Sequence, residues 1–233
     1  MRCSLKNIIW LAELWVAGTV RKGVELMELI AGKEINSMFL YHYFERERGP
    51  FLSLSDLTDE EAKKIQDALK EDNNIYCRRD SDGTYMFYRR LIENRIRSMF
   101  IEKGGKPTRK TPHYMIIGEC GYCNTWYKNP NYIKIPVKEF DMDTVSFTYG
   151  DSFPTFDPTH GDKSEYRQNI YTYDEIKKII EKYGWPQEIP WNENTPYWQP
   201  LYVEAQVWSD DTIKKYRNEW LTMNSKNIHN TML

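Results

Sequence analysis

The sequence predicts a single mixed α+β domain of roughly five short strands and four helices. Helix-like and strand-like segments follow one another without a regular strand–helix–strand rhythm, which argues against a doubly wound parallel sheet. Aromatic residues make up 15% of the 233 residues, including 17 Tyr and 8 Trp. This density favours a β-containing core with Tyr and Trp around its edge. We therefore expect one compact unit at residues 38–222.

Five segments have the composition of strands. The first, residues 38–44, is a short aromatic run of high β-propensity. The other four are residues 112–120, 131–141, 143–151 and 201–208. In the last of these, alternation places Tyr202, Glu204 and Gln206 on one face, and the apolar residues between them on the other. This polar face is either the solvent side of the strand or the floor of a polar cleft.

Four segments have helical patterns with recognisable ends. One begins at Thr58, an N-cap with Glu61 in the capping-box position. Another begins at Thr172, with Glu175 in the same position, and ends at Gly184. The two remaining helices are expected at residues 85–103 and 209–221, and the tail at residues 223–233 is expected to be frayed.

Residues 1–37 are expected to form an N-terminal helical extension. Their apolar run, residues 8–18, is too short to span a bilayer and contains Glu13, so we expect neither a membrane span nor an export signal. An over-extended gene start is the alternative, with Met38 as the native first residue. Four cysteines are too few for a disulfide scaffold of this length, and we expect a cytoplasmic protein.

Charge excludes a globally basic nucleic-acid binder, because the net charge is −2. Locally, the helix at residues 85–103 carries basic residues interleaved with aromatic ones, which favours contact with phosphates or nucleic acid. The alternative is a solvated surface. The basic residues in question are Arg89, Arg90, Arg95 and Arg97. The Cys120–Cys123 pair is half of a zinc site, a redox pair or two ordinary thiols, and we predict no metal site.

The loop after the strand at residues 143–151 is a second candidate site. Tyr149, Asp151 and Ser152 follow one another where a strand ends, and loops at such places often carry functional groups. The structural alternative is a turn at Gly150 with Asp151 as its cap.

Several stretches together resemble a family of bacterial cytoplasmic proteins of unknown function. They are "YHYFERERGPFLSLSDL", "IEKGGKPTRKTPHYM", "FTYGDSFPTF", "YTYDEIKKIIEKYG" and "YVEAQVW", and the likeness runs from about Met38 to Arg217. The strands "LYHYF", "SFTYGDS" and "YVEAQVW" also resemble those of ADP-ribosyltransferase-like domains. This second resemblance implies that His42 holds NAD, that Tyr149 contacts the nicotinamide, and that Glu204 stabilises an oxocarbenium-like transition state.

The same resemblance implies further NAD contacts from Arg46, Asp151, Ser152 and Gln206. NAD, or a related nucleotide, would then be a substrate, and no cofactor is firmly implied. The alternative function is a non-catalytic module that binds protein or nucleic acid through the basic helix and the aromatic loops.

Overall fold

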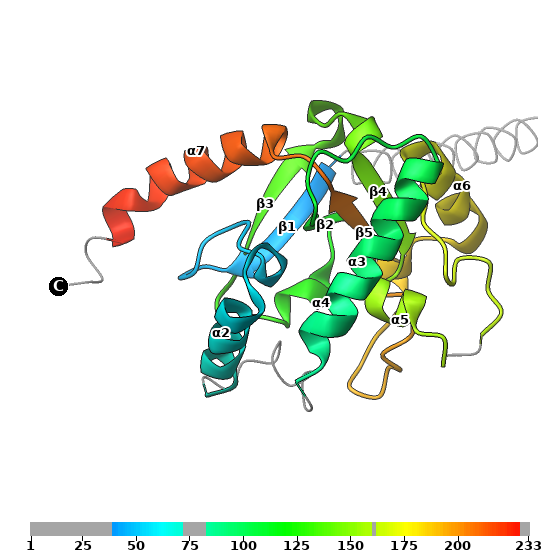
Figure 1. The fold of residues 1–233 in the computed structure, drawn as a ribbon, viewed down its shortest axis with the longest axis horizontal. Coiled ribbons are helices and arrows are strands. Elements are labelled where there is room, and N and C mark those ends of the chain that lie inside the picture. The colour runs from blue at the N-terminus through cyan, green and yellow to red at the C-terminus, as the bar shows by residue number, and fades with distance from the viewer. Residues whose placement is uncertain (1–38, 72–82, 160–161, 229–233) are drawn as a thin grey trace, which may run out of the picture.

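The computed structural model describes residues 39–71, 83–159 and 162–228 of the chain. The expected extension at residues 1–37 and the start at Met38 lie outside these residues. A five-stranded antiparallel sheet with helices packed around it forms the centre of the molecule (Figure 1). Its strand order is β3-β1-β2-β5-β4. The strands are β1 (Phe39–Glu45), β2 (His113–Ile117), β3 (Pro130–Pro136), β4 (Val145–Tyr149) and β5 (Val203–Val207). The predicted α+β class is confirmed.

The four predicted long helices are present, and both predicted capping boxes are formed. The backbone N–H of Thr58 donates to the Glu61 carboxylate at 3.0 Å, and that of Thr172 donates to Glu175 at 2.9 Å. The helices are α2 (Asp59–Glu71), α3 (Tyr85–Glu102), α6 (Tyr173–Tyr183) and α7 (Asp211–Ile228). The last continues beyond residue 222, where the sequence predicted the domain to end.

Short elements connect the long ones, and the sequence did not predict them. Two are single helical turns, α4 (Gly121–Asn124) and α5 (Ser152–Phe156). Four are 3-10 turns: η1 (Leu54–Asp56), η3 (Val137–Glu139), η4 (Met142–Thr144) and η5 (Pro186–Glu188). Of these, η1 and α5 matter most for the site, because both pack against α3.

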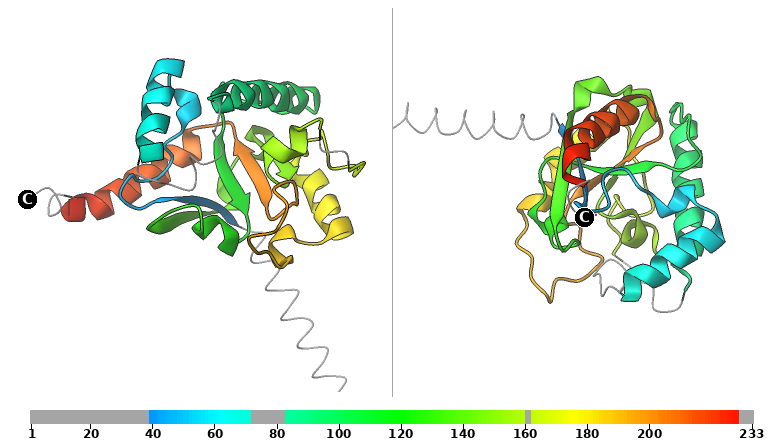
Figure 2. Two further views of the ribbon diagram at one scale, coloured as in Figure 1. Left: turned by 90° about the horizontal axis from the view of Figure 1, so that it is seen from below. Right: turned by 90° about the vertical axis from the view of Figure 1, so that its left-hand side faces the viewer.

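The two faces of the sheet differ in character. One face carries the main apolar core, with Phe147, Ala205 and Val207 packed beneath Ile176 of α6. The opposite face, at the centre of the sheet, is polar but buried, and α3 and α5 lie over it (Figure 2). Adjacent strands pair polar residues there, namely Ser146 with Gln206 and Thr148 with Glu204. The polar face of β5 is therefore a covered cleft floor.

The sheet opens between β1 and β2. These strands pair at Leu40–Ile117 and Tyr41–Ile116, whereas β1 stays registered with β3 from Phe39 to Glu45. Figure 2 shows β1 and β3 leaning away from β2 and β5. The divergence leaves room for a cavity at this end of the sheet.

Candidate active site

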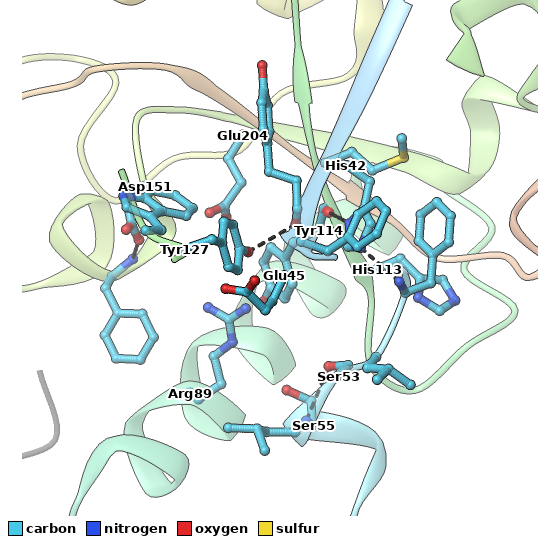
Figure 3. Close-up of a pocket in the computed structure, with 18 of the residues that line it drawn as sticks. His42, Glu45, Ser53, Ser55, Arg89, His113, Tyr114, Tyr127, Asp151 and Glu204 are labelled. Atoms are coloured by element: carbon cyan, nitrogen blue, oxygen red, sulfur yellow. Dashed lines mark hydrogen bonds between the residues drawn. The ribbon is translucent and has the colours of Figure 1, made fainter. Parts of the chain in front are cut away.

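A cavity of about 890 Å³ lies where β1 and β2 diverge, beneath η1, α2 and α3. Its walls are largely aromatic, and a few polar groups converge on it (Figure 3). This combination is typical of small-molecule sites. The aromatic lining includes Tyr43, Tyr85, Tyr114, Trp126, Phe153 and Tyr202.

Glu204 provides the cavity with a buried carboxylate. It lies on the inner strand β5 between Ile116 of β2 and Thr148 of β4, and only 6% of its surface is exposed. Burial, and after it the negative charge of Asp151, raise the pKa of Glu204 to about 7, although the nearby Arg89 cation acts in the opposite direction. The Gln206 amide donates to Glu204 Oε1 at 3.0 Å. Near neutral pH, Glu204 can therefore both give and accept a proton.

Asp151 and Ser152 lie at the start of α5, beside Glu204. Asp151 lines the cavity and caps α5, because its carboxylate accepts a hydrogen bond from the Phe153 N–H at 2.8 Å. The two roles that the sequence left open for Asp151 therefore coexist. Ser152 is fully buried, and its hydroxyl lowers the pKa of Glu204. Gly150 makes the turn possible: its φ is +108°, and a Cβ there would lie 3.4 Å from Pro200.

Arg89 forms the wall that α3 contributes. Its guanidinium lies flat over the Tyr114 ring, 3.6 Å from the centroid, and 5.6 Å from that of Phe153. Arg89 Nε donates to Glu93 Oε1 at 3.1 Å. The same Glu93 oxygen accepts hydrogen bonds from Ser55 Oγ at 2.7 Å and from the Tyr114 hydroxyl at 3.0 Å. Residues of α3, η1 and β2 therefore hold Arg89 in position, directly or through Glu93.

The sequence did not single out Glu93 or the role of Arg89 in a cavity, although it contains a signal. The buried residues of α3 are Met86, Arg89, Glu93, Ile96 and Phe100. Their spacing of three and four residues defines the face of the helix that points inward. Arg89 and Glu93 thus occupy core positions, where charged residues are rare unless they are paired.

His42 lines the cavity, but its ring is engaged by the backbone. Nδ1 lies 3.0 Å from the Tyr114 carbonyl, and Nε2 accepts the Phe51 N–H at 2.8 Å. Burial lowers the pKa of His42 to about 4, so the ring is neutral. Figure 3 shows it beside His113 and away from Glu204. His42 therefore bridges the diverging strands, and both of its ring nitrogens already have backbone partners.

Tyr149 lies on the other face of the sheet. Strand alternation groups it with Phe147 in the apolar core, and its hydroxyl donates to the carbonyls of Tyr183 at 3.3 Å and Gly184 at 3.0 Å. Tyr149 is therefore not brought together with His42 and Glu204, in contrast to the expectation from the resemblance.

Replacing Tyr149 by phenylalanine is expected to lower stability by about 1 kcal/mol, the value of a typical hydrogen bond. It should leave ligand binding in the cavity unchanged, because the hydroxyl lies on the far face. Denaturant unfolding measures the first effect, and ligand titration measures the second. A selective loss of binding in a stable variant would contradict this placement.

Two other predicted NAD contacts lie outside the cavity lining. Arg46 is exposed in the turn after β1, and its N–H donates to the Asn129 carbonyl at 3.0 Å. Gln206 is fully buried; its amide donates to Glu204 and to Thr148, and its oxygen accepts from Ser146. Gln206 therefore holds Glu204 in place from beneath the cavity lining.

The basic helix does not present a continuous cationic surface. Arg89 is buried, and Arg90 donates to Asp59 and to the Leu57 carbonyl. Arg97 donates to the carbonyls of Pro107 and Arg109, and the exposed Arg95 lies over the Phe156 ring at 5.1 Å. Most of these guanidinium groups stabilise the fold, which weakens the alternative of nucleic-acid binding.

Cys120 and Cys123 are free, buried thiols that pack against Tyr43 and Tyr202. Cys120 precedes the single turn α4, and a hydrogen bond from Cys123 lowers the pKa of the Cys120 thiol, whereas burial raises that of Cys123. Among the described residues, no group of three or more His, Cys, Asp or Glu side chains is placed to hold a metal ion.

Comparisons of the chain with protein-family models, with curated proteins and with solved structures each return no match. None of the helices in the described ranges has the length and apolar character needed to cross a bilayer. The function of the cavity must therefore be inferred from its own geometry.

Proposed function

We propose that the cavity is an active site that cleaves the N-glycosidic bond of NAD or a related nucleotide, with Glu204 as its catalytic carboxylate. The observation that carries this proposal is a buried carboxylate with a pKa of about 7 inside an aromatic-lined cavity. Functional sites are where such strongly shifted acids concentrate.

The chemistry of glycosidic cleavage matches the groups present. Departure of the base leaves an oxocarbenium-like sugar, which a neighbouring carboxylate stabilises until water or another nucleophile adds to its anomeric carbon and loses a proton. Ionised Glu204 would accept a hydrogen bond from a ribose hydroxyl and stabilise that positive charge. The nicotinamide of NAD leaves as a neutral base without a proton, whereas a purine would need one, which protonated Glu204 would donate. Both forms of Glu204 coexist near neutral pH.

The neighbouring groups would support this role. Asp151 adds a second carboxylate beside Glu204 and favours the protonated form of Glu204 by its negative charge. The rings of Trp126 and Tyr202 offer planar surfaces on which a base can stack. This arrangement replaces the expected triad with Glu204 and Asp151, supported by Arg89.

The test is release of free base from NAD and from purine nucleotides, followed by mass spectrometry. The wild-type protein should release base, and Glu204→Gln should reduce the rate by about a hundredfold or more, because it removes both the charge and the exchangeable proton. Tyr149→Phe is the matched control and should retain the wild-type rate. Equal rates in wild type and Glu204→Gln would refute the assignment, and so would a folded wild type without activity.

A further inference from the structure

The geometry points to Arg89 as the group that recognises an anionic part of the ligand, a phosphate or a carboxylate. The inference rests on the proposed function only in treating the cavity as a ligand site. It adds the residue that would bind the anionic group of the ligand, which neither Glu204 nor the aromatic walls could do.

The first support is the cost of placing an arginine there. Arg89 is buried, and a buried guanidinium is retained only where partners compensate its desolvation. The lining of the cavity on α2 and η1 includes Leu57, Ile65 and Leu69, so an apolar residue would suit the chemistry of this wall. Apolar packing alone therefore does not require a cation at this position, and binding of an anionic ligand would give a reason for one.

The second support is orientation. Arg89 Nε donates to Glu93, and the guanidinium carbon lies over the Tyr114 ring at 3.6 Å and over the Phe153 ring at 5.6 Å from the centroids. The terminal nitrogens of Arg89 then point toward the region of Glu45 and Glu204 (Figure 3). A guanidinium held in this way presents the edge that binds the two oxygens of a carboxylate or phosphate together.

The third support is that Glu93 is itself held in place. It is 2% exposed and accepts hydrogen bonds from Ser55 of η1 and Tyr114 of β2, as well as from Arg89. Glu93 is therefore a positioning residue for Arg89. Residues that orient a binding group in this way are a regular part of preorganised sites.

The acidic residues of the lining indicate where the non-anionic part of the ligand would lie. Glu45 accepts the backbone N–H groups of Lys128 and Asn129, both at 2.9 Å, and so secures a loop. Asp151 and Glu204 lie together on the side of β4 and β5. The cavity thus has a cationic wall on α3 and an acidic corner beside the sheet. A ligand with an anionic group at one end and a neutral or cationic part at the other matches this polarity.

The experiment uses ligand pairs that differ in charge. Isothermal titration compares AMP with adenosine for the phosphate, and benzoate with benzyl alcohol for the carboxylate. The wild type should bind at least one anion more tightly than its neutral partner, by about tenfold to a hundredfold, which is the contribution of hydrogen bonds to a charged group. The pair that shows the preference identifies which anion is recognised.

Variants assign the preference to Arg89. Arg89→Met combined with Glu93→Gln removes the cation without leaving a buried carboxylate unpaired, and should abolish the preference for the anion. Arg95→Met, on the same helix but exposed beside Phe156, should retain it. A preference that survives in the double variant, or no preference in the wild type, would overturn the inference. Neither result depends on turnover, so the proposed function is tested separately.

Discussion

The thermal stability of the wild-type protein, relative to that of Glu204→Gln, is expected to fall as pH rises from about 4.5 to about 7. The folded protein holds the Glu204 proton up to a pKa of about 7, whereas the unfolded chain releases it near the ordinary value of 4.5. Between these values the folded state binds more protons than the unfolded state, so raising the pH favours unfolding. Above pH 7 Glu204 is ionised in both states, and the full loss of stability from burying its charge is present.

The expected size is about 3 kcal/mol, which follows from the difference between the two pKa values. For a chain of this length it corresponds to roughly 5–10 °C in melting temperature. Glutamine cannot ionise, and its oxygen can still accept the Gln206 amide that Glu204 now accepts. The variant should therefore be more stable than wild type at about pH 8 and similar to it at about pH 4.

Calorimetric unfolding of both proteins across this pH range measures the effect. Glu45→Gln is the matched control, because burial also raises the pKa of Glu45, yet its two oxygens accept the amides of Lys128 and Asn129. That variant loses an acceptor and should be less stable than wild type at neutral pH. Parallel pH profiles for wild type and Glu204→Gln would show that Glu204 titrates normally and is not poised for acid–base chemistry.

Local sequence signals predicted most of the elements of the fold. Capping boxes at Thr58 and Thr172 marked two helix starts, because the hydrogen bonds involved span only three residues. Strand order and the opening between β1 and β2 depend on contacts between distant segments, such as His42 with the Tyr114 carbonyl. No local pattern in a single sequence encodes such contacts.

The alternation of side chains along the strands explains which of the predicted site residues share a face of the sheet. Glu204 shares a face with Gln206, and that face pairs with Ser146 and Thr148 of β4. Alternation along β4 then assigns Tyr149 to the opposite, apolar face. The alternation of polar and apolar residues along β4 thus separates Tyr149 from Glu204, whereas the resemblance to ADP-ribosyltransferase-like domains implies that they meet. The cavity lies on the polar face because α3, η1 and α5 pack together over that face. The sequence did not reveal this packing.

Removing the Glu93 carboxylate alone is expected to destabilise the protein by about 3–5 kcal/mol, the usual cost of breaking a buried ion pair from one side. Glu93→Ala would leave the Arg89 guanidinium buried without its carboxylate, and would deprive Ser55 and Tyr114 of their acceptor. Glu93→Gln keeps an acceptor oxygen and should cost less. Denaturant unfolding of the two variants measures the difference.

The double variant that combines Arg89→Met with Glu93→Gln is the informative comparison for Glu93→Ala. Because both charges are removed together, this double variant should recover much of the stability that Glu93→Ala loses. If it is as stable as wild type, the ion pair contributes little net stability, and ligand binding is the remaining reason for burying two charges in the core of α3. If instead it is as unstable as Glu93→Ala, the pair is needed for the fold itself. A purely structural role for Arg89 would then account for its position without any ligand.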